Sequence, residues 1–306
     1  MKILVTGAHG LLGRCLLLQR QADLELVGCG RSAEPVAGRP CHAVDLGDPR
    51  AVATLVRQVR PDWVIHTAAL TSVDQCETEP ELARHLNVDL VANVAQACRA
   101  AGSGLVHLST DYVFDGAAGP YAEGDPPRPL SSYGRLKLAS ETVALEAGVP
   151  ALVIRTLWLY GHVTGARRNL VTWPLEALSR GERLRIVDDQ WGNPTCARDL
   201  AGLLLDLCRQ GTTGLFHVGG ATFLTRYELV LELADRFGLE RALVEPMSTA
   251  AAAQAAPRPL RSGLRSEAVT TALGRRPLSL AEGLQRLRQE EDFRRDFPDL
   301  AKPPPR

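Results

Sequence analysis

The chain has 306 residues, of which 45% are hydrophobic and 23% are charged. This length is too large for one typical hydrophobic core and too small for three, and it excludes a small domain held together by disulfides or metal ions. The composition excludes a disordered chain and a chain of long apolar runs. The 35 basic and 35 acidic residues give a formal net charge of zero, which supplies none of the net positive field that phosphate-backbone binding uses, so we expect no nucleic-acid partner.

The first part of the chain alternates short, β-branched apolar runs with longer stretches of helical period. Such alternation is typical of βαβ units around a parallel sheet. Strands are expected at Lys2–Thr6, Leu24–Val27, His42–Asp45, Asp62–His66, Gly104–Ser109 and Ala151–Arg155. Helices are expected after Gly10, at Pro49–Val59 and from Pro80 to a stop at Gly102. The sequence therefore predicts an α/β fold with a doubly wound parallel sheet of the Rossmann type over residues 1–160.

A glycine-rich turn with G-x-x-G-x-x-G spacing follows the first expected strand and opens the first helix. In that context the first glycine permits a tight turn, the second lets the backbone approach a pyrophosphate, and the third allows close packing of helix on strand. The N-terminus of the helix then faces the anion. The turn predicts a dinucleotide site. Its expected residues are Gly7, His9, Gly10, Leu11, Leu12 and Gly13.

Arg31 follows the second expected strand, with no carboxylate beside it. An acidic side chain at this place accepts a hydrogen bond from the ribose of NAD, whereas a cation accommodates the phosphate of NADP. The sequence therefore favours NADPH, with NADH as the alternative cofactor, unless Arg31 is only a solvated surface arginine. Asp45 and Leu46, at the end of the third expected strand, are placed to contact the adenine. Asp45 could instead cap the following helix, although Asp48 is better placed to do so.

Tyr133 and Lys137 form a Y-x-x-x-K pair whose four-residue spacing puts both side chains on one face of a helix. A phenol with a pKa near about 10 becomes a usable acid or base at neutral pH when an ammonium and a nicotinamide cation lie close to it. Ser109 and Thr110 are hydroxyl residues at the end of the fifth expected strand, the sheet edge where such folds bind ligands. The sequence predicts a catalytic group of Thr110, Tyr133 and Lys137.

Beyond Gly161 the alternation is looser. Helices are expected at Asn169–Arg180, Ala197–Cys208 and Tyr227–Phe237, with a strand at Leu184–Val187. We expect residues 161–306 to form a smaller, interleaved substrate-binding lobe with segments that return to the sheet.

Near the C-terminus, Ser279 and Glu282 have the spacing of a capping box at the start of one more helix. Residues 250–256 are expected to form an Ala/Gln-rich connector, and residues 302–306, with three prolines, a frayed tail. Neither segment suggests chemistry.

The seven cysteines are odd in number, scattered and never in a C-x-x-C pair, so we expect reduced packing residues and neither a disulfide framework nor a zinc knuckle. No cluster of carboxylates or histidines has ligand spacing, so no metal is expected. The chain opens directly on a strand without a leader, and no apolar run approaches about 18 residues. We expect a cytoplasmic protein with no membrane partner.

Several further segments carry a resemblance to a known family. They are His66–Ala69, Thr71–Glu77, Ser109–Gly116, Arg155–Gly161, Asp189–Thr195 and Arg258–Pro259. Over nearly its whole length the chain resembles the extended short-chain dehydrogenase/reductase superfamily and, within it, the dTDP-4-dehydrorhamnose reductase family. The glycine turn is shared across the superfamily, whereas the V-D-x-x-E and S-T-D-Y-V-F segments are more specific.

The resemblance implies a role for each matching residue. Tyr133 would be the proton donor, Lys137 its pKa partner and a ribose contact, and Thr110 the residue that hydrogen-bonds the substrate carbonyl. Ala68 and Ala69 would contact the cofactor. The residues implied on the nucleotide-sugar side are Asp74, Thr110, Asp111, Trp158, Asn169, Gln190 and Arg258.

Three of these substrate-side residues have structural alternatives. Trp158 could be a plain core tryptophan rather than a pocket wall. Arg258 could clamp a diphosphate or merely hold the connector, and Asn169 could only cap its helix. Some members of the family are associated with magnesium, but the sequence offers no ligand cluster for it.

The implied activity is NADPH-dependent reduction of the 4-keto group of a nucleotide-linked 6-deoxy sugar, with dTDP-4-dehydro-L-rhamnose as the family's substrate. Related dehydratases place a glutamate after the aspartate that follows the threonine, whereas Asp111 is followed here by Tyr112. An epimerase keeps its NAD bound, which a cation favouring NADPH fits less well.

An alternative function belongs to another class. The chain also resembles the regulatory β subunit of methionine adenosyltransferase, which acts by binding a partner enzyme and shares the Gly28–Gly30 type of second-strand ending. Fold alone does not separate the two functions. The V-D-x-x-E segment and Trp158 favour the reductase, and homodimer formation is left open.

Overall fold

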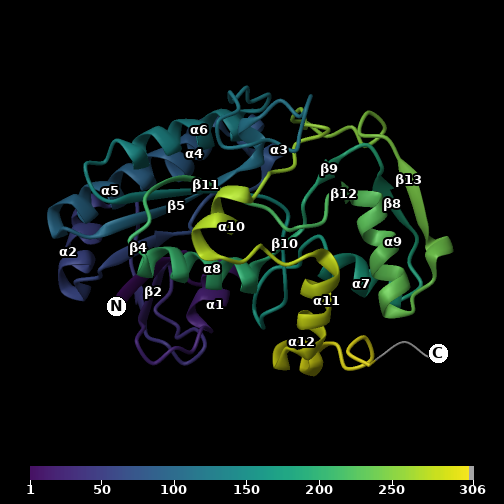
Figure 1. Cartoon of the computed structure of the whole chain (residues 1–306), viewed down its shortest axis with the longest axis horizontal. Helices are drawn as coiled ribbons and strands as arrows, with labels where there is room; N and C mark the ends of the chain where they lie inside the picture. The colour runs from purple at the N-terminus through teal and green to yellow at the C-terminus, as the bar shows by residue number, and fades with distance from the viewer. Residues whose placement is uncertain (303–306) are drawn as a thin grey trace.

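A seven-stranded sheet forms the centre of the computed structural model, which describes residues 1–302 (Figure 1). Its strands are β1 (Lys2–Thr6), β2 (Glu25–Gly30), β3 (Cys41–Ala43), β4 (Trp63–His66), β5 (Gly104–Thr110), β6 (Ala151–Thr156) and β11 (Gly214–Val218). The order across the sheet is β11-β6-β5-β4-β1-β2-β3, and all pairings are parallel. The order reverses between β1 and β4, which is where such sheets bind ligands. The predicted doubly wound sheet is confirmed. The tail expected from residue 302 lies, beyond its first residue, outside the described range.

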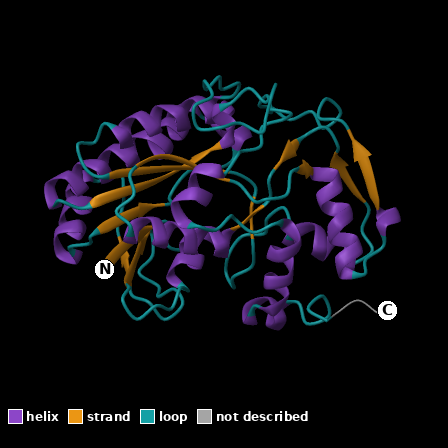
Figure 2. Cartoon of the chain, in the orientation of Figure 1, coloured by secondary structure: helices purple, strands orange, loops and turns teal. Residues whose placement is uncertain are grey.

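Helices cover both faces of the sheet (Figures 1 and 2). One face carries α2 (Pro49–Val59), α5 (Leu90–Ala101) and α6 (Ser132–Leu145), which pack side by side. The other face carries α1 (Leu11–Leu17) and α8 (Ala197–Arg209), which also contact each other. Each face therefore has its own apolar core, as expected for parallel strands that are buried on both sides.

The segment expected as one helix from Pro80 to Gly102 is interrupted in the structure. It consists of α4 (Pro80–Arg84), the π-helical turn η1 (His85–Asp89) and α5, and the short helix α3 (Val73–Thr78) precedes it. The π turn places the buried Asn87 against Leu70, whose backbone N–H and carbonyl it binds at 3.0 and 3.1 Å. No apolar period signals this turn, because it serves a polar contact.

Strand β11 was not among the predicted strands. It pairs with β6 at the edge of the sheet, and only two of its five residues are buried. An edge strand with so few buried positions gives a weak apolar pattern. The chain beyond residue 160 thus supplies both β11 and α8 to the sheet layers, and a division into two lobes at that residue stays a prediction.

Most of the remaining elements lie beside the sheet, toward the right of Figure 2, whereas α10 (Glu267–Leu273) contacts β11 and α8. Three two-stranded pairs lie there: β7 (Leu159–Tyr160) with β10 (Thr195–Cys196), β9 (Trp191–Gly192) with β12 (Leu224–Thr225), and β8 (Leu184–Val187) with β13 (Val244–Met247). The helices of the C-terminal half other than α8 are α7 (Thr172–Ser179), α9 (Arg226–Phe237), α10 (Glu267–Leu273), α11 (Leu280–Gln289) and α12 (Glu291–Asp296), with the 3-10 turn η3 (Arg241–Leu243).

Two capping boxes fix helix starts in this region. Ser279 and Glu282 form the predicted box at α11, and Thr225 and Glu228 form a second box at α9 that the sequence analysis had not identified. The predicted strand Leu184–Val187 is confirmed as β8.

All seven cysteines are unpaired and buried. Burial raises the pKa of the Cys29 thiol to about 12, so this thiol stays protonated and acts as a packing residue. Within residues 1–302, no helix combines the length and the apolar character needed to cross a membrane.

Candidate active site

The glycine turn joins β1 to α1 at the carboxyl edge of the sheet. Gly7 has a φ of +66°, and a Cβ at this position would lie 2.7 Å from Thr67 Oγ1. A Cβ on Gly13 would lie 2.3 Å from the Gly7 carbonyl oxygen, so only glycine lets α1 start this close to the turn. Gly10 precedes α1 and offers no side-chain cap. The first turn of α1 therefore fits a phosphate group that accepts from backbone N–H donors.

Arg31 is exposed immediately after β2 and makes no ion pair within residues 1–302. His9 Nε2 lies 3.0 Å from the carbonyl oxygen of Glu34, so this histidine ties the glycine turn to the loop that carries Arg31. The guanidinium is free to meet a phosphate on the ribose of a dinucleotide that lies along the turn.

The loop after β3 lies at the adenine side of the expected dinucleotide. The expected strand ended at Asp45, whereas β3 ends at Ala43 and leaves Asp45 in the loop. Asp45 Oδ1 accepts from the N–H of Gly47 at 2.8 Å. Asp48 caps α2, so the alternative role for Asp45 as a helix cap is wrong. Leu46 is buried in the core under α2 and α5. Ala68 and Ala69 follow β4 at the same edge.

Thr110 and Tyr133 meet where β5 ends. Thr110 is the last residue of β5, and Tyr133 lies in the first turn of α6. Burial raises the pKa of Tyr133, and a hydrogen bond with the Thr110 side chain partly opposes that rise. The phenol is consequently protonated at neutral pH, which is the state a proton donor requires.

Lys137 shares the buried face of α6 with Tyr133, but its ammonium points elsewhere. Its Nζ lies 3.2 Å from Nε2 of His107 on β5, and no hydrogen bond joins it to Tyr133 within the described residues. Burial lowers the pKa of Lys137 to about 8, while Glu141 opposes this shift. The expectation that Lys137 lowers the tyrosine pKa is therefore not met by direct contact in this structure.

Two buried histidines lie near Lys137. The sequence analysis gave neither a role at the site, although His66 opens one of the segments that carry the family resemblance. His66 on β4 and His107 on β5 stand opposite each other in the sheet, with ring centroids 5.9 Å apart. Burial lowers the pKa of His66 to about 3 and that of His107 well below its usual range, and Lys137 adds to both shifts. Both rings are neutral, and Nε2 of His107 lies 2.8 Å from Ser140 Oγ as well as 3.2 Å from Lys137 Nζ. His107 accepts from the lysine only in the tautomer whose Nε2 carries no proton. In the sequence they read only as polar interruptions of two apolar strands.

Helix α6 is docked closely on the loop after β5. A Cβ on Gly134 would lie 2.1 Å from the carbonyl oxygen of Tyr112 in η2 (Asp111–Val113), so glycine is required for this approach. Glu77, the glutamate of the V-D-x-x-E segment, accepts from the N–H and the hydroxyl of Ser132, each at 2.7 Å. These contacts fix where Tyr133 stands relative to Thr110.

Residues 256–265, here called the strap, cross from the connector after β13 to the sheet edge. Asp74 in α3 accepts from the N–H of Ala256 at 2.9 Å and from Arg258 Nη2 at 2.7 Å. The Arg258 side chain is only 7% exposed, and its Nη1 has no hydrogen-bond partner within residues 1–302. Arg258 thus holds the chain after the connector, and it keeps N–H donors for an anion. The connector, which was expected to carry no chemistry, leads directly into this contact.

A second polar cluster lies where β9 and α9 begin. Gln190 accepts from Arg226 Nε at 2.9 Å and donates to Thr249 and Gln254 at 3.0 and 3.1 Å. The Arg226 guanidinium lies 4.5 Å from the ring centroid of Trp158, which has a positive φ of 46°. Such a backbone conformation is strained for tryptophan and is typical of functional sites. Arg226 was missed because it follows no recognised motif.

Asn169 and Asp111 direct their polar atoms into the protein. Asn169 accepts from the N–H of Val171 at 3.1 Å and donates to the Gly161 carbonyl at 2.7 Å, which fits the capping alternative. Asp111 is 1% exposed, and its two carboxylate oxygens accept from Thr110 and from Ser262.

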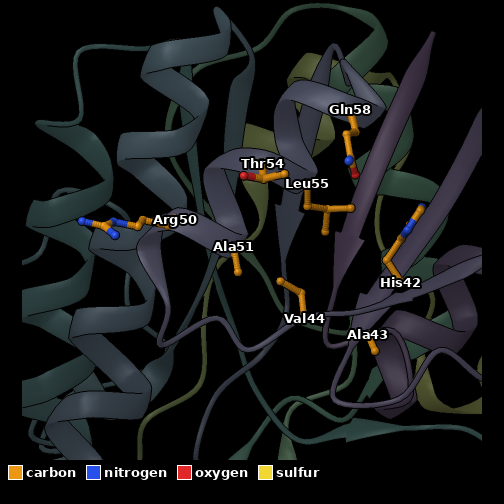
Figure 3. A pocket seen from close by; sticks show the side chains of 8 residues that line it. All are labelled: His42, Ala43, Val44, Arg50, Ala51, Thr54, Leu55 and Gln58. Atoms are coloured by element: carbon orange, nitrogen blue, oxygen red, sulfur yellow. The ribbon is translucent and has the colours of Figure 1, made fainter.

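A hollow of about 350 Å³ lies between β3 and α2, away from Thr110 and Tyr133 (Figure 3). Its lining residues are His42, Ala43, Val44, Arg50, Ala51, Thr54, Leu55 and Gln58. None of the residues expected at the site is among them. Within residues 1–302, no group of three or more His, Cys, Asp or Glu side chains is arranged to hold a metal ion.

The chain is similar to known proteins over most of its length. The family model described as RmlD substrate binding domain matches residues 1–292. A probable dTDP-4,6-dihydroxy-2-methyloxan-3-one 4-ketoreductase of Streptomyces antibioticus is 39% identical over 267 residues, covering 86% of each chain. Methionine adenosyltransferase 2 subunit beta of Rattus norvegicus is 34% identical over 255 residues, which are 81% of this chain and 75% of that protein.

Among solved structures, the dTDP-4-dehydrorhamnose reductase of Bacillus anthracis str. Ames in complex with NADP superposes with a TM-score of 0.85. It is 30% identical, and the match covers 94% of this chain and 98% of that chain. The resemblance inferred from the sequence motifs is confirmed: the chain belongs to the RmlD substrate binding domain family.

Proposed function

We propose that this protein is an NADPH-dependent reductase of the 4-keto group of a nucleotide-linked 6-deoxy sugar. The observation that carries the proposal is the pairing of a buried, protonated Tyr133 with Thr110 at the carboxyl edge of the sheet, beside the glycine turn. This arrangement combines a dinucleotide site with hydroxyl groups where the oxygen of a carbonyl would gain negative charge.

Each side chain at the site has a separate role in the reduction. NADPH, when bound, supplies the hydride to the carbonyl carbon. Tyr133 gives its proton to the oxygen of that carbonyl, and Thr110 holds the same region of the sugar by hydrogen bonds. Lys137, charged below about pH 8, contributes positive charge near the ribose and near the phenolate that Tyr133 becomes.

We propose that the nucleotide sugar is bound by residues of the strap and of the polar cluster around Gln190. Arg258 is mostly buried, and its Nη1 has no hydrogen-bond partner among the described residues, 1–302, which suits an anionic diphosphate. Trp158 and Gln190 supply an aromatic face and an amide, groups that suit a sugar or a base. We choose dTDP-4-dehydro-L-rhamnose as the substrate, with dTDP-L-rhamnose as the product, and the names of the reductases similar to this chain support that choice.

The test is to mix the protein with NADPH and a panel of dTDP- and UDP-linked 4-keto sugars. Loss of the nicotinamide absorbance together with a reduced sugar on chromatography is the expected result. The sugar with the highest kcat/KM identifies the substrate. Failure to consume NADPH with every member of the panel would reject the proposal.

A second candidate is a regulatory subunit, because methionine adenosyltransferase β subunits are similar to this chain at 34–35% identity. In that function the protein would bind NADP and a catalytic methionine adenosyltransferase subunit without reducing a sugar. Size-exclusion chromatography with such a subunit tests it. A stable complex, together with no turnover of any keto sugar, would favour the second candidate over the first.

A further inference from the structure

A buried chain of hydroxyl and carboxyl groups links the strap to Thr110. Ser262 donates to one carboxylate oxygen of Asp111, and Thr110 Oγ1 donates to the other at 3.1 Å. The exposed fractions of Ser262, Asp111 and Thr110 are 2%, 1% and 5%. Ser262 belongs to none of the motifs identified in the sequence. It comes from the strap, whereas Thr110 ends β5, so two distant parts of the chain meet in these bonds.

The strap is fixed on either side of Ser262 by backbone hydrogen bonds to the loop after η2. The N–H of Arg261 donates to the Gly116 carbonyl at 2.9 Å, and the N–H of Tyr121 donates to the Gly263 carbonyl at 2.8 Å. The position of the Ser262 hydroxyl is therefore set by the backbone on both sides.

The hydrogen bonds of Thr110 determine what this residue can offer a substrate. A hydroxyl has one proton and two lone pairs. The N–H of Tyr112 donates to one lone pair at 3.2 Å, and the proton points to Asp111. The other lone pair is left for the neighbouring Tyr133, whose pKa the Thr110 side chain lowers against the effect of burial. In this arrangement Thr110 has no proton left for a substrate carbonyl.

We propose that Ser262 and Asp111 are positioning residues that set the direction of the Thr110 hydroxyl: ionised Asp111 holds Thr110 as an acceptor, and protonated Asp111 releases it as a donor to the substrate carbonyl. The step is the binding of one solvent proton to Asp111. The neutral carboxyl donates to the remaining lone pair of Thr110. Both the Thr110 proton and the Tyr133 proton are then available to the carbonyl oxygen. This inference rests on the proposed function.

The surroundings of Asp111 allow both protonation states. Burial raises the pKa of Asp111 to about 6, and the hydrogen bonds from Ser262 and Thr110 oppose the rise. The charged and titratable groups that face it are Arg226 at the start of α9, Tyr112 in η2 and Tyr133 on α6. Asp111 is neutral below about pH 6 and ionised above it, so we expect kcat to fall as the pH rises through that value.

The kinetic test compares the dependence of kcat on pH in the wild type, Ser262→Ala and Ser262→Thr. Removing a donor to the carboxylate disfavours its ionised form, so the fall in kcat should move up by about one pH unit in Ser262→Ala. Ser262→Thr keeps a hydroxyl and should keep the wild-type profile. The KM for NADPH should not change in either variant. If the fall in kcat stays at the wild-type pH in Ser262→Ala, the proposal is rejected.

A second readout does not depend on turnover. The pKa of the Asp111 carboxyl can be followed by NMR on protein labelled with ¹³C at the aspartate carboxyl carbon. We expect this pKa to rise by about one unit, a tenfold increase in proton affinity, in both Ser262→Ala and Ser262→Cys. The cysteine keeps the side-chain volume but donates only weakly. Ser103→Ala is the matched control, because Ser103 is equally buried but donates to the Pro61 carbonyl at the amino ends of the strands.

The two readouts separate this inference from the proposed function. An Asp111 pKa that is the same in the wild type and in both Ser262 variants would reject the inference. No turnover of any 4-keto nucleotide sugar by the wild type would instead reject the proposed function. The NMR titration would then still decide whether Ser262 controls the ionisation of Asp111.

Discussion

Tyr133 is the residue on which the proposed proton transfer depends. Burial raises the pKa of its phenol and keeps it protonated, and the neighbouring Thr110 side chain partly opposes that rise. Replacing Tyr133 with Phe should lower kcat by about 10² to 10⁴-fold, the scale for one positioned acid, with little change in NADPH affinity. Steady-state kinetics and a fluorescence titration with NADPH measure the two effects. Tyr227→Phe, which alters a tyrosine of α9 outside the proposed machinery, is the control; undiminished turnover in Tyr133→Phe would remove Tyr133 from the mechanism.

Arg31 should decide between the two nicotinamide cofactors. It stands exposed after β2, where its charge can meet the extra phosphate of NADPH. Arg31→Asp should weaken NADPH binding by about 10- to 100-fold and leave NADH binding equal or stronger, since the new carboxylate can accept from a ribose hydroxyl. Arg20→Asp makes the same charge change elsewhere and serves as the control. A variant that still prefers NADPH would show that Arg31 is a solvated arginine.

His107 should set the pH at which Lys137 loses its charge. Nε2 of the ring lies 3.2 Å from the ammonium, and in the tautomer that leaves Nε2 without a proton the ring accepts from it. That bond favours the charged lysine, whose pKa burial lowers to about 8. His107→Leu removes this acceptor, so activity at alkaline pH should be lost at a lower pH than in the wild type. A kcat profile between pH 6 and 10, with steps of about half a unit, measures the shift.

The matched control for His107 is His217→Leu, which removes an equally buried imidazole from β11. It should reduce stability without moving the alkaline limb of the kcat profile, because the His217 ring contacts Arg155 and the Tyr121 carbonyl rather than Lys137. If kcat falls at the same alkaline pH in His107→Leu as in the wild type, His107 is only a packing residue.

At the scale of elements, the distance between α6 and η2 sets the geometry of the site. Gly134 is the point of closest approach, since a Cβ there would lie 2.1 Å from the Tyr112 carbonyl oxygen. Gly134→Ala must push α6 away from η2, which should cost about 1–3 kcal/mol of unfolding free energy and lower kcat at least tenfold. Thermal unfolding and kinetics measure both effects.

The control for Gly134 is Ala139→Gly, an exposed change on the same helix. It should cost up to about 1 kcal/mol through helix propensity and leave kcat unchanged. Equal loss of activity in both variants would show that kcat follows the stability of α6 and not its distance from η2.

At the scale of the whole molecule, the strap connects the sheet edge to the segment that follows β13. Asp74 and Arg258 form its first contact, and Ser262 reaches Asp111 further along. Arg258→Met should raise the KM for the nucleotide sugar about tenfold or more and increase hydrogen exchange in residues 254–262, because the strap loses its anchor. Arg258→Lys, which keeps the charge, should have a smaller effect on both. Unchanged exchange in Arg258→Met would show that the strap is held elsewhere.

The sequence by itself determined the sheet, the glycine turn and the identity of the residues at its carboxyl edge. Apolar runs and glycine spacing are local signals, and they are strong where strands are buried on both faces. They also identified Thr110, Tyr133 and Lys137, whose spacing matches a helix and a strand end. Weakly buried β11 was missed because it produces no clear apolar period. The π turn at Asn87 was missed because the four-residue spacing of the apolar residues between Leu82 and Val94 continues through it and indicates one helix.

Only the tertiary structure decided which side chains meet. Lys137 turns to His107 and not to Tyr133, and Ser262 from the strap reaches Asp111 across 151 positions of sequence. Arg226 joins Trp158 and Gln190 in the same way, from three separate segments. Polar contacts of this kind depend on the packing of distant segments, and burial then sets the pKa values of the groups involved. No local pattern records either effect, so the direction in which each hydroxyl donates became visible only in the folded chain.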